Sequence, residues 1–243
     1  MPRPPRVQFP GAFYHVMSRG NAKQNIFLSR DDRLDFLHAL ERVVDRFSWV
    51  CHAYCLMENH YHLLIETPEA NLSQGMQDLN GAYCHLFNMK YARVGHVTQG
   101  RFLSPLIEDD GYLLQLLRYI SLNPVRSDLV RAPEQWKWSS YRAMVGIVPV
   151  PPFLEIGYIL RLFSDDMDHA RNACIRFVAE GLEEFTVNQG HETALEPLFR
   201  GVMDRQSRNR AISKAHLDLG FNAQEIADHL NLDISTVYRA IGK

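Results

Sequence analysis

The chain has 243 residues, of which 46% are hydrophobic, and this is enough for one domain with a substantial core and a smaller second one. Its four cysteines lack the pair-and-pair spacing of a zinc site, its first ten residues are polar and proline-rich rather than a signal peptide, and no apolar run approaches the length of a membrane span. These features predict a cytoplasmic protein without a membrane partner.

The net charge of −2 does not by itself indicate nucleic-acid binding, but the charge is unevenly distributed. Residues 1–145 have a net charge of +2, residues 146–199 of −6 and residues 200–243 of +2. An acidic connector therefore separates two mildly basic parts. This pattern permits DNA binding without proving it, because local patches matter more than the total.

Hydrophobic periodicity predicts mixed strands and helices in the first part of the chain. In chain order, the expected elements are a strand over 12–18, a helix over 31–47, two strands within 49–67 that turn near Glu58-Asn59, a helix from 71 to about 91, a strand pair over 97–107 interrupted at Gly100, and a helix over 111–122 that Asn123-Pro124 ends. Hairpins mixed with helices predict an α+β fold, and we expect a ferredoxin-like antiparallel sheet covered by helices.

Two histidines one residue apart, His60 and His62, lie in the second strand of the predicted hairpin. Residues i and i+2 of a strand point to the same face, so the two imidazoles project side by side while Tyr61 points the other way. Two imidazoles on one rigid face are a start for a divalent-metal site. Two half-buried histidines that bind no metal are the alternative.

The predicted helix over 111–122 offers partners for these histidines. Tyr119 and Asn123 are four residues apart and share one helix face. Phosphoryl transfer needs an oxygen nucleophile and a cation that neutralises charge on the phosphate. His60, His62 and the Asn123 oxygen could hold that metal while Tyr119 attacks. A helix that is merely packed is the alternative, and Tyr112 and Tyr141 are rival nucleophiles.

Past residue 145 the sequence predicts an acidic helical connector and a DNA-binding segment. The connector, 146–199, opens on a proline-rich run, and its expected buried positions are Leu160, Leu162, Phe163, Ile175, Phe177 and Val178. In 200–243 two helical runs, 223–230 and 235–241, have the spacing of a helix-turn-helix. The side chains expected to face DNA are Ser235, Thr236, Tyr238 and Arg239. A plain helical hairpin is the alternative.

Several ordered motifs in residues 5–145 resemble the single-tyrosine insertion-sequence transposases, which carry a His-hydrophobe-His motif. The motifs are His60-Tyr61-His62, Tyr119 within RYISLNPVR, Arg19-Gly20-Asn21, Gln99-Gly100-Arg101-Phe102 and the run from Asn123 to Arg126. The subgroup that the chain is most similar to is the REP-associated tyrosine transposases. Two positions depart from the family pattern, since Glu58 stands where proline is usual and Tyr61 is bulkier than the usual aliphatic residue.

This resemblance implies an endonuclease and strand transferase that acts on single-stranded and hairpin DNA. It implies a 5′-phosphotyrosine intermediate at Tyr119 and a Mg²⁺ or Mn²⁺ ion held by His60, His62 and a third polar side chain, for which Asn123 is in place. The expected DNA contacts within residues 1–145 are Arg19, Asn21, Arg101, Arg118 and Arg126. In a bacterial cell such a protein would be cytoplasmic and associated with the nucleoid when bound to DNA, and a homodimer is left open.

Two other functions stay open at this stage. One is a catalytically silent DNA-binding regulator that uses the helix-turn-helix, and the other is a metal hydrolase that uses a water nucleophile. The joint presence of His60, His62, Tyr119 and Asn123 argues against the regulator. A covalent adduct between the protein and DNA would separate the transposase from the hydrolase.

Overall fold

The computed structural model describes residues 6–189, 199, 204–217, 221, 223–230 and 232–241. The chain forms two compact units, residues 1–181 and residues 182–243. None of the described helices is both long enough and apolar enough to span a bilayer.

Unit 1 is built on a four-stranded antiparallel sheet in which the strand order is β2-β3-β1-β4. The strands are β1 (Ala12–Arg19), β2 (Val50–Leu56), β3 (His60–Thr67) and the short β4 (Leu106–Ile107). The central strand β1 pairs with β3 along its whole length, from Ala12 opposite Thr67 to Arg19 opposite His60. Sheet and helices together confirm the predicted α+β class and the predicted hairpin.

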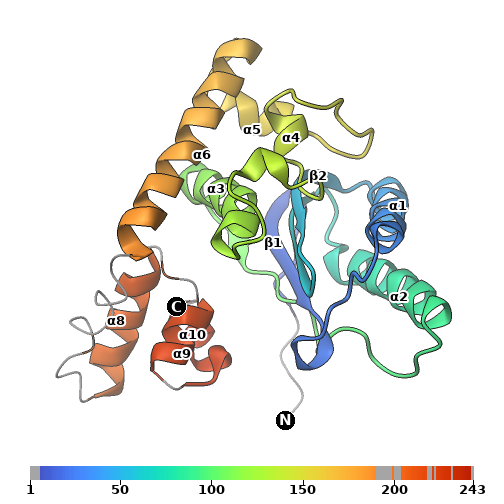
Figure 1. The fold of residues 1–243 in the computed structure, drawn as a ribbon, viewed down its shortest axis with the longest axis horizontal. Coiled ribbons are helices and arrows are strands. Elements are labelled where there is room, and N and C mark those ends of the chain that lie inside the picture. Colours follow the sequence, from blue (N-terminus) through green and yellow to red (C-terminus); the bar gives the residue numbers. More distant parts are fainter. Residues whose placement is uncertain are drawn as a thin grey trace. The chain divides into compact units, whose positions relative to one another are not determined.

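Helices cover both faces of this sheet (Figure 1). On one side lie α1 (Arg30–Phe47) and α2 (Leu72–Lys90), and on the other lies α3 (Asp110–Arg126). The side chains of β3 point alternately to the two faces of the sheet. Tyr61 enters the α1–α2 side, where its ring lies 4.6 Å from that of Phe36 and its hydroxyl donates to Asn80 Oδ1 at 2.7 Å. His60 and His62 consequently face α3.

Helix α3 continues through Pro124 to Arg126, so the prediction that Asn123-Pro124 ends it is wrong. Proline removes one N–H and usually breaks a helix interior. Here it lies in the last turn, and the carbonyls of Asn123 and Pro124 still accept hydrogen bonds, from Ser127 N–H and Leu129 N–H respectively, both at 3.0 Å. Asn123 is therefore inside the helix, with its side chain buried.

The strand pair expected over 97–107 is also wrong, because only β4 is a regular strand. The preceding residues follow β1 through single bridges, Gly20 to Thr98 and Met17 to Leu103. Gly100 has a φ of 60°, which interrupts the extended backbone, and Pro105 has no N–H for a ladder. The segment remains attached to β1, as the bond from His15 N–H to the Pro105 carbonyl (3.0 Å) illustrates.

Unit 1 continues to Gly181, past the boundary predicted at residue 145. The proline-rich run returns to the sheet, where the Glu155 N–H donates to the Cys51 carbonyl at 2.8 Å. The remaining helical elements of this unit are η1 (Asn21–Lys23), η2 (Pro133–Gln135), α4 (Tyr141–Met144), α5 (Gly157–Arg161) and α6 (Met167–Gln189), the last of which extends beyond it. Val178 of α6 is buried as expected, but Ile175 is 40% exposed because it lies beside the buried stripe.

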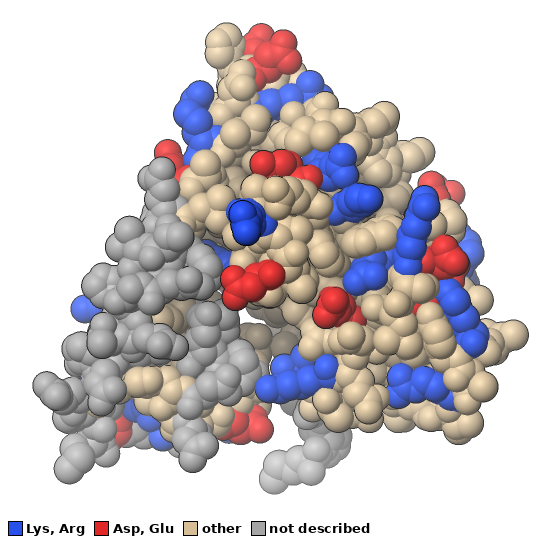
Figure 2. All heavy atoms as spheres, viewed as in Figure 1, with Lys and Arg blue, Asp and Glu red and all other residues tan. Residues whose placement is uncertain are grey.

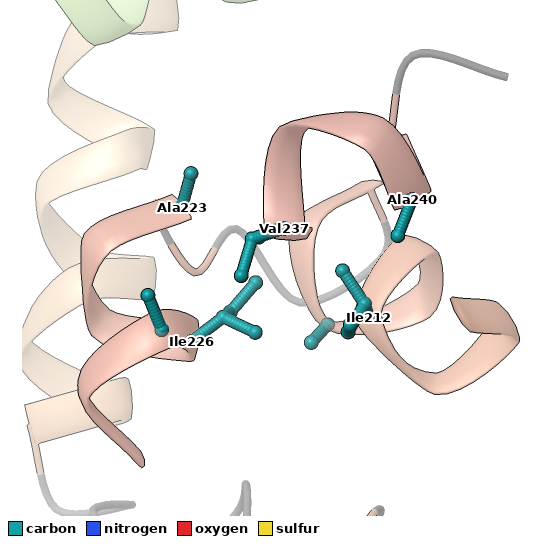
Figure 3. Close-up of a cluster of buried hydrophobic side chains, with 7 residues drawn as sticks. Ile212, Ala223, Ile226, Val237 and Ala240 are labelled. Atoms are coloured by element: carbon teal, nitrogen blue, oxygen red, sulfur yellow. The ribbon is translucent and has the colours of Figure 1, made fainter. Parts of the chain in front are cut away.

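Unit 2 contains three described helices, α8 (Arg205–Leu217), α9 (Ala223–His229) and α10 (Ile234–Ile241), around an apolar cluster. Figure 3 shows Ile212, Ile226 and Val237, one from each helix, pointing toward one another. Two of these helices coincide with the predicted helical runs. That α9 and α10 bind DNA as a helix-turn-helix stays a prediction.

Candidate active site

The structure brings four predicted residues together between β3 and α3. His60 and His62 project from β3, with ring centroids 4.9 Å apart. From α3, the Tyr119 ring lies 5.3 Å from the ring of His62, edge to face, and Asn123 Nδ2 lies 3.3 Å from His62 Nε2. The cluster forms because residues two apart on a strand and residues four apart on a helix each share one face, and these two faces meet.

A fifth residue, His15 of β1, belongs to the cluster although sequence patterns did not indicate it. Its Nε2 lies 2.9 Å from His62 Nδ1, and the two rings stack with centroids 5.1 Å apart. The His15 ring also lies 5.9 Å from the Tyr119 ring. Both His15 and His62 are buried. Only the β1–β3 register places them side by side, so no local motif announces the pair.

Both motif histidines are neutral at pH 7. Burial lowers the pKa of His60 to about 4, a hydrogen bond with Asn123 opposes this change, and the charge of Arg19 adds to it. Burial, with smaller contributions from His60 and His15, holds the pKa of His62 well below its usual value. Neutral imidazoles are the form that a metal ion requires.

The donors fit a divalent cation. His60 Nδ1 lies 2.7 Å from Asn59 Oδ1, an atom that can only accept, and the tautomer with its proton on Nδ1 leaves the Nε2 lone pair for a metal. Rotation of the Asn123 amide would present its oxygen instead of its nitrogen beside His62. Among the described residues no three His, Cys, Asp or Glu side chains form a metal-binding group. The amide of Asn123, beside His62, is the predicted third donor.

The predicted DNA contacts occupy different surroundings. Arg19 pairs across the sheet with His60 and donates to Gln99 Oε1 at 3.2 Å. Asn21 lines an open hollow shared with His96, Thr98 and Gly100. Arg101 is exposed. On the face in Figure 2, the drawn Lys and Arg side chains are scattered among Asp and Glu rather than gathered into one field.

Two arginines of α3 have opposite environments. The guanidinium carbon of Arg126 lies 5.8 Å from the centre of the Tyr119 ring, which places a cation beside the predicted nucleophile. Arg118 is buried instead, with its guanidinium 3.8 Å from the Phe177 ring and paired with Glu180 Oε2 at 3.3 Å. Because this charge fastens α6 to α3 inside unit 1, Arg118 is not among the DNA contacts that we propose.

The rival tyrosines lie elsewhere. Tyr141 is buried in α4, and burial raises its pKa. Tyr112 lies two helical turns before Tyr119, in the first turn of α3, where its N–H donates to Asp109 Oδ1 at 2.8 Å. Of the three, Tyr119 is the one whose ring contacts His15 and His62.

In unit 2, the four side chains expected to face DNA differ in exposure. Ser235 and Arg239 are exposed, Thr236 is partly buried, and Tyr238 packs against the apolar cluster. Arg239 donates to the Ser235 carbonyl at 3.1 Å and to Thr236 Oγ1 at 3.3 Å. Arg239, in the last turn of α10, thus bonds back to two residues at the start of the helix, and the three polar residues form one connected group.

Comparison with known proteins gives matches over the part of the chain that contains this cluster. Residues 9–122, which include His60, His62 and Tyr119, match the family described as IS200-like transposase, and Asn123 lies one residue beyond the match. A Haemophilus influenzae protein named as a REP-associated tyrosine transposase is 30% identical over an alignment of 119 residues, and the match covers 44% of this chain and 67% of that protein.

A solved structure of a REP-associated tyrosine transposase bound to a REP hairpin has a TM-score of 0.53 to this chain at 18% sequence identity. The match covers 64% of this chain and 93% of that one, and at this identity it shows a shared fold. Sequence and fold therefore agree, and the chain belongs to the IS200-like transposase family, among the REP-associated tyrosine transposases.

Proposed function

We propose that this transposase is a metal-dependent nickase and strand transferase for single-stranded DNA, with Tyr119 as its nucleophile. The observation that carries the proposal is the position of the Tyr119 ring against His62, in one cluster with His60 and Asn123. A catalytically silent regulator is not favoured, because such a protein would not need these four side chains to converge.

In the proposed reaction, Tyr119 Oη attacks a phosphorus atom of the DNA backbone. The bond from Oη to phosphorus forms as the bond from phosphorus to the 3′-oxygen breaks, which yields a 5′-phosphotyrosine and a free 3′-hydroxyl. The phenol loses a proton and the 3′-oxygen gains one. Because the ester replaces one phosphodiester bond with another of similar energy, a 3′-hydroxyl can reverse the step and join strands without ATP.

Other residues of the cluster and its surroundings would bind the metal and supply positive charge. His60, His62 and Asn123 would bind a Mg²⁺ or Mn²⁺ ion, which would supply positive charge to the phosphate oxygens. Arg126 adds a fixed cation beside the Tyr119 ring, where negative charge develops on the phosphate. Arg19 adds another beside His60.

We propose hairpin-containing single-stranded DNA as the substrate, because a structural relative was solved with a REP hairpin. Unit 2 would add affinity for the stem through Ser235, Thr236 and Arg239 without contributing chemistry. A cytoplasmic location, at the nucleoid when DNA is bound, follows from that substrate. The element order β1-α1-β2-β3-α2-β4, with strand order β2-β3-β1-β4, supports a ferredoxin-like classification of the sheet.

The test is a covalent-adduct assay with labelled hairpin DNA and Mn²⁺, followed by a denaturing gel. We expect wild type to give a protein–DNA adduct and Tyr119→Phe to give none, since only one oxygen is removed and the ring packing is kept. Tyr112→Phe, on the same helix, is the matched control and should behave like wild type. Adduct formation by Tyr119→Phe, or mass spectrometry that locates the nucleotide on Tyr112 or Tyr141, would overturn the assignment.

A further inference from the structure

We propose that His15 is a positioning residue that holds His62 in the tautomer able to bind a metal through Nε2. The inference deepens the proposed function and rests on it, because it assigns a role beside a proposed metal ligand. In this role the Nε2 atom of His15 accepts a hydrogen bond from Nδ1–H of His62.

The first support is geometric. The two nitrogens are 2.9 Å apart, and the rings stack at an interplanar angle of 28°. His15 is opposite Leu64 in the β1–β3 ladder, so His62 is its diagonal neighbour on the same face of the sheet. The exposed fractions of His15 and His62 are 5% and 3%, so water does not compete freely for this bond.

The second support is the partner on the other side of the His62 ring. A neutral imidazole has one donor and one acceptor nitrogen. With the amide in this orientation, Asn123 Nδ2 donates to His62 Nε2 across 3.3 Å, an arrangement that requires the lone pair on Nε2 and the proton on Nδ1. His15 Nε2 must then be the acceptor at the other end. A metal on His62 Nε2 would use the same lone pair, and the bond to His15 would persist.

His60 follows the same rule with a different partner, since its Nδ1 faces the oxygen of Asn59 at 2.7 Å. In the tautomer that leaves Nε2 for a metal, each motif histidine thus has a neighbour that can accept its Nδ1 proton. Outer partners of this kind fix the orientation and basicity of a ligand, and their loss weakens metal affinity roughly 10- to 100-fold. His15 differs from Asn59 in being buried.

The test compares two substitutions of His15 with a control. His15→Gln retains an oxygen that can accept from His62 Nδ1–H, whereas His15→Leu fills similar space and can accept nothing. His52→Leu is the control, because His52 is another buried histidine of the sheet, whose ring nitrogens face Glu66 at 3.1 Å and Glu155 at 3.2 Å. Mn²⁺ affinity is measured by electron paramagnetic resonance, and the His62 tautomer by ¹⁵N NMR of the metal-free protein.

We expect His15→Leu to weaken Mn²⁺ binding by about 10- to 100-fold and to mix the two tautomers of His62, while His15→Gln stays within a few-fold of wild type. His52→Leu should bind Mn²⁺ as wild type does. Equal Mn²⁺ affinity of His15→Leu and wild type, or a His62 proton on Nε2 in metal-free wild type, would overturn the inference. If wild type bound no Mn²⁺ at all, the proposed function would fail instead. Should His15→Leu not fold, the tautomer in wild type still decides.

Discussion

Acidification should destabilise this protein through His60 over a defined pH range. In the folded chain its pKa is about 4, because burial disfavours the charged ring, whereas in the unfolded chain it is near 6.5. As the pH falls, the unfolded chain takes up the proton first. The stability contributed by the neutral ring is therefore complete above pH 6.5 and is lost progressively as the pH falls toward 4.

At a pH below both pKa values, the difference between them corresponds to a loss of about 3 kcal/mol in the free energy of unfolding. About 2 kcal/mol of this is lost between pH 7 and pH 5. The assay is urea denaturation of wild type and His60→Gln at both pH values in the presence of EDTA. The stability difference between the two proteins should shift by about 2 kcal/mol in favour of His60→Gln at pH 5. His38→Gln, at an exposed site of α1, controls for replacing any histidine. The same pH dependence in wild type and His60→Gln would refute the reasoning.

Two further predictions use matched pairs. A Cβ at Gly75 of α2 would lie 2.2 Å from Trp49 Cζ2, whereas one at Gly81 of the same helix would meet nothing within 4 Å. Urea denaturation should therefore show Gly81→Ala stabilised by about 0.5–1 kcal/mol and Gly75→Ala destabilised by about 1–3 kcal/mol. Equal effects of the two substitutions would contradict this packing. Arg239→Ala should weaken hairpin binding and lower the slope of log binding constant against log salt concentration by about 0.9 for each DNA phosphate that Arg239 neutralises. Arg176→Ala, at an exposed site of α6, is the control and should leave this slope unchanged. Identical slopes for the two variants would contradict the proposed DNA contact of Arg239.

The sequence was sufficient for elements whose signal is local. The helix predicted over 31–47 is an example, because the structure begins it with a capping box: the Ser29 hydroxyl accepts from the Asp32 N–H, and the Asp32 carboxylate accepts from the Ser29 N–H. The alternation of Tyr61 with His60 and His62 likewise requires only the two-residue period of a strand. Patterns of this kind predicted the α+β class and the antiparallel sheet.

Features that depend on pairing across the chain were not accessible. His15 is one histidine among apolar neighbours until the β1–β3 register places it against His62. Arg118 looks like a surface cation in sequence, and only the packing of α6 shows that its charge is used against Glu180. Proline at 124 was expected to end its helix because a rule for helix interiors was applied to a last turn.

The β1–β3 register also governs whether the proposed active site can form. A strand exchanges its two faces when its pairing slips by one residue. Such a slip in β3 would turn His60 and His62 toward the α1–α2 side and bring Tyr61 toward Tyr119. A misaligned sheet would thus lose the cluster of His60, His62 and Tyr119 as well as stability, so the proposed cleavage of DNA would require correct folding.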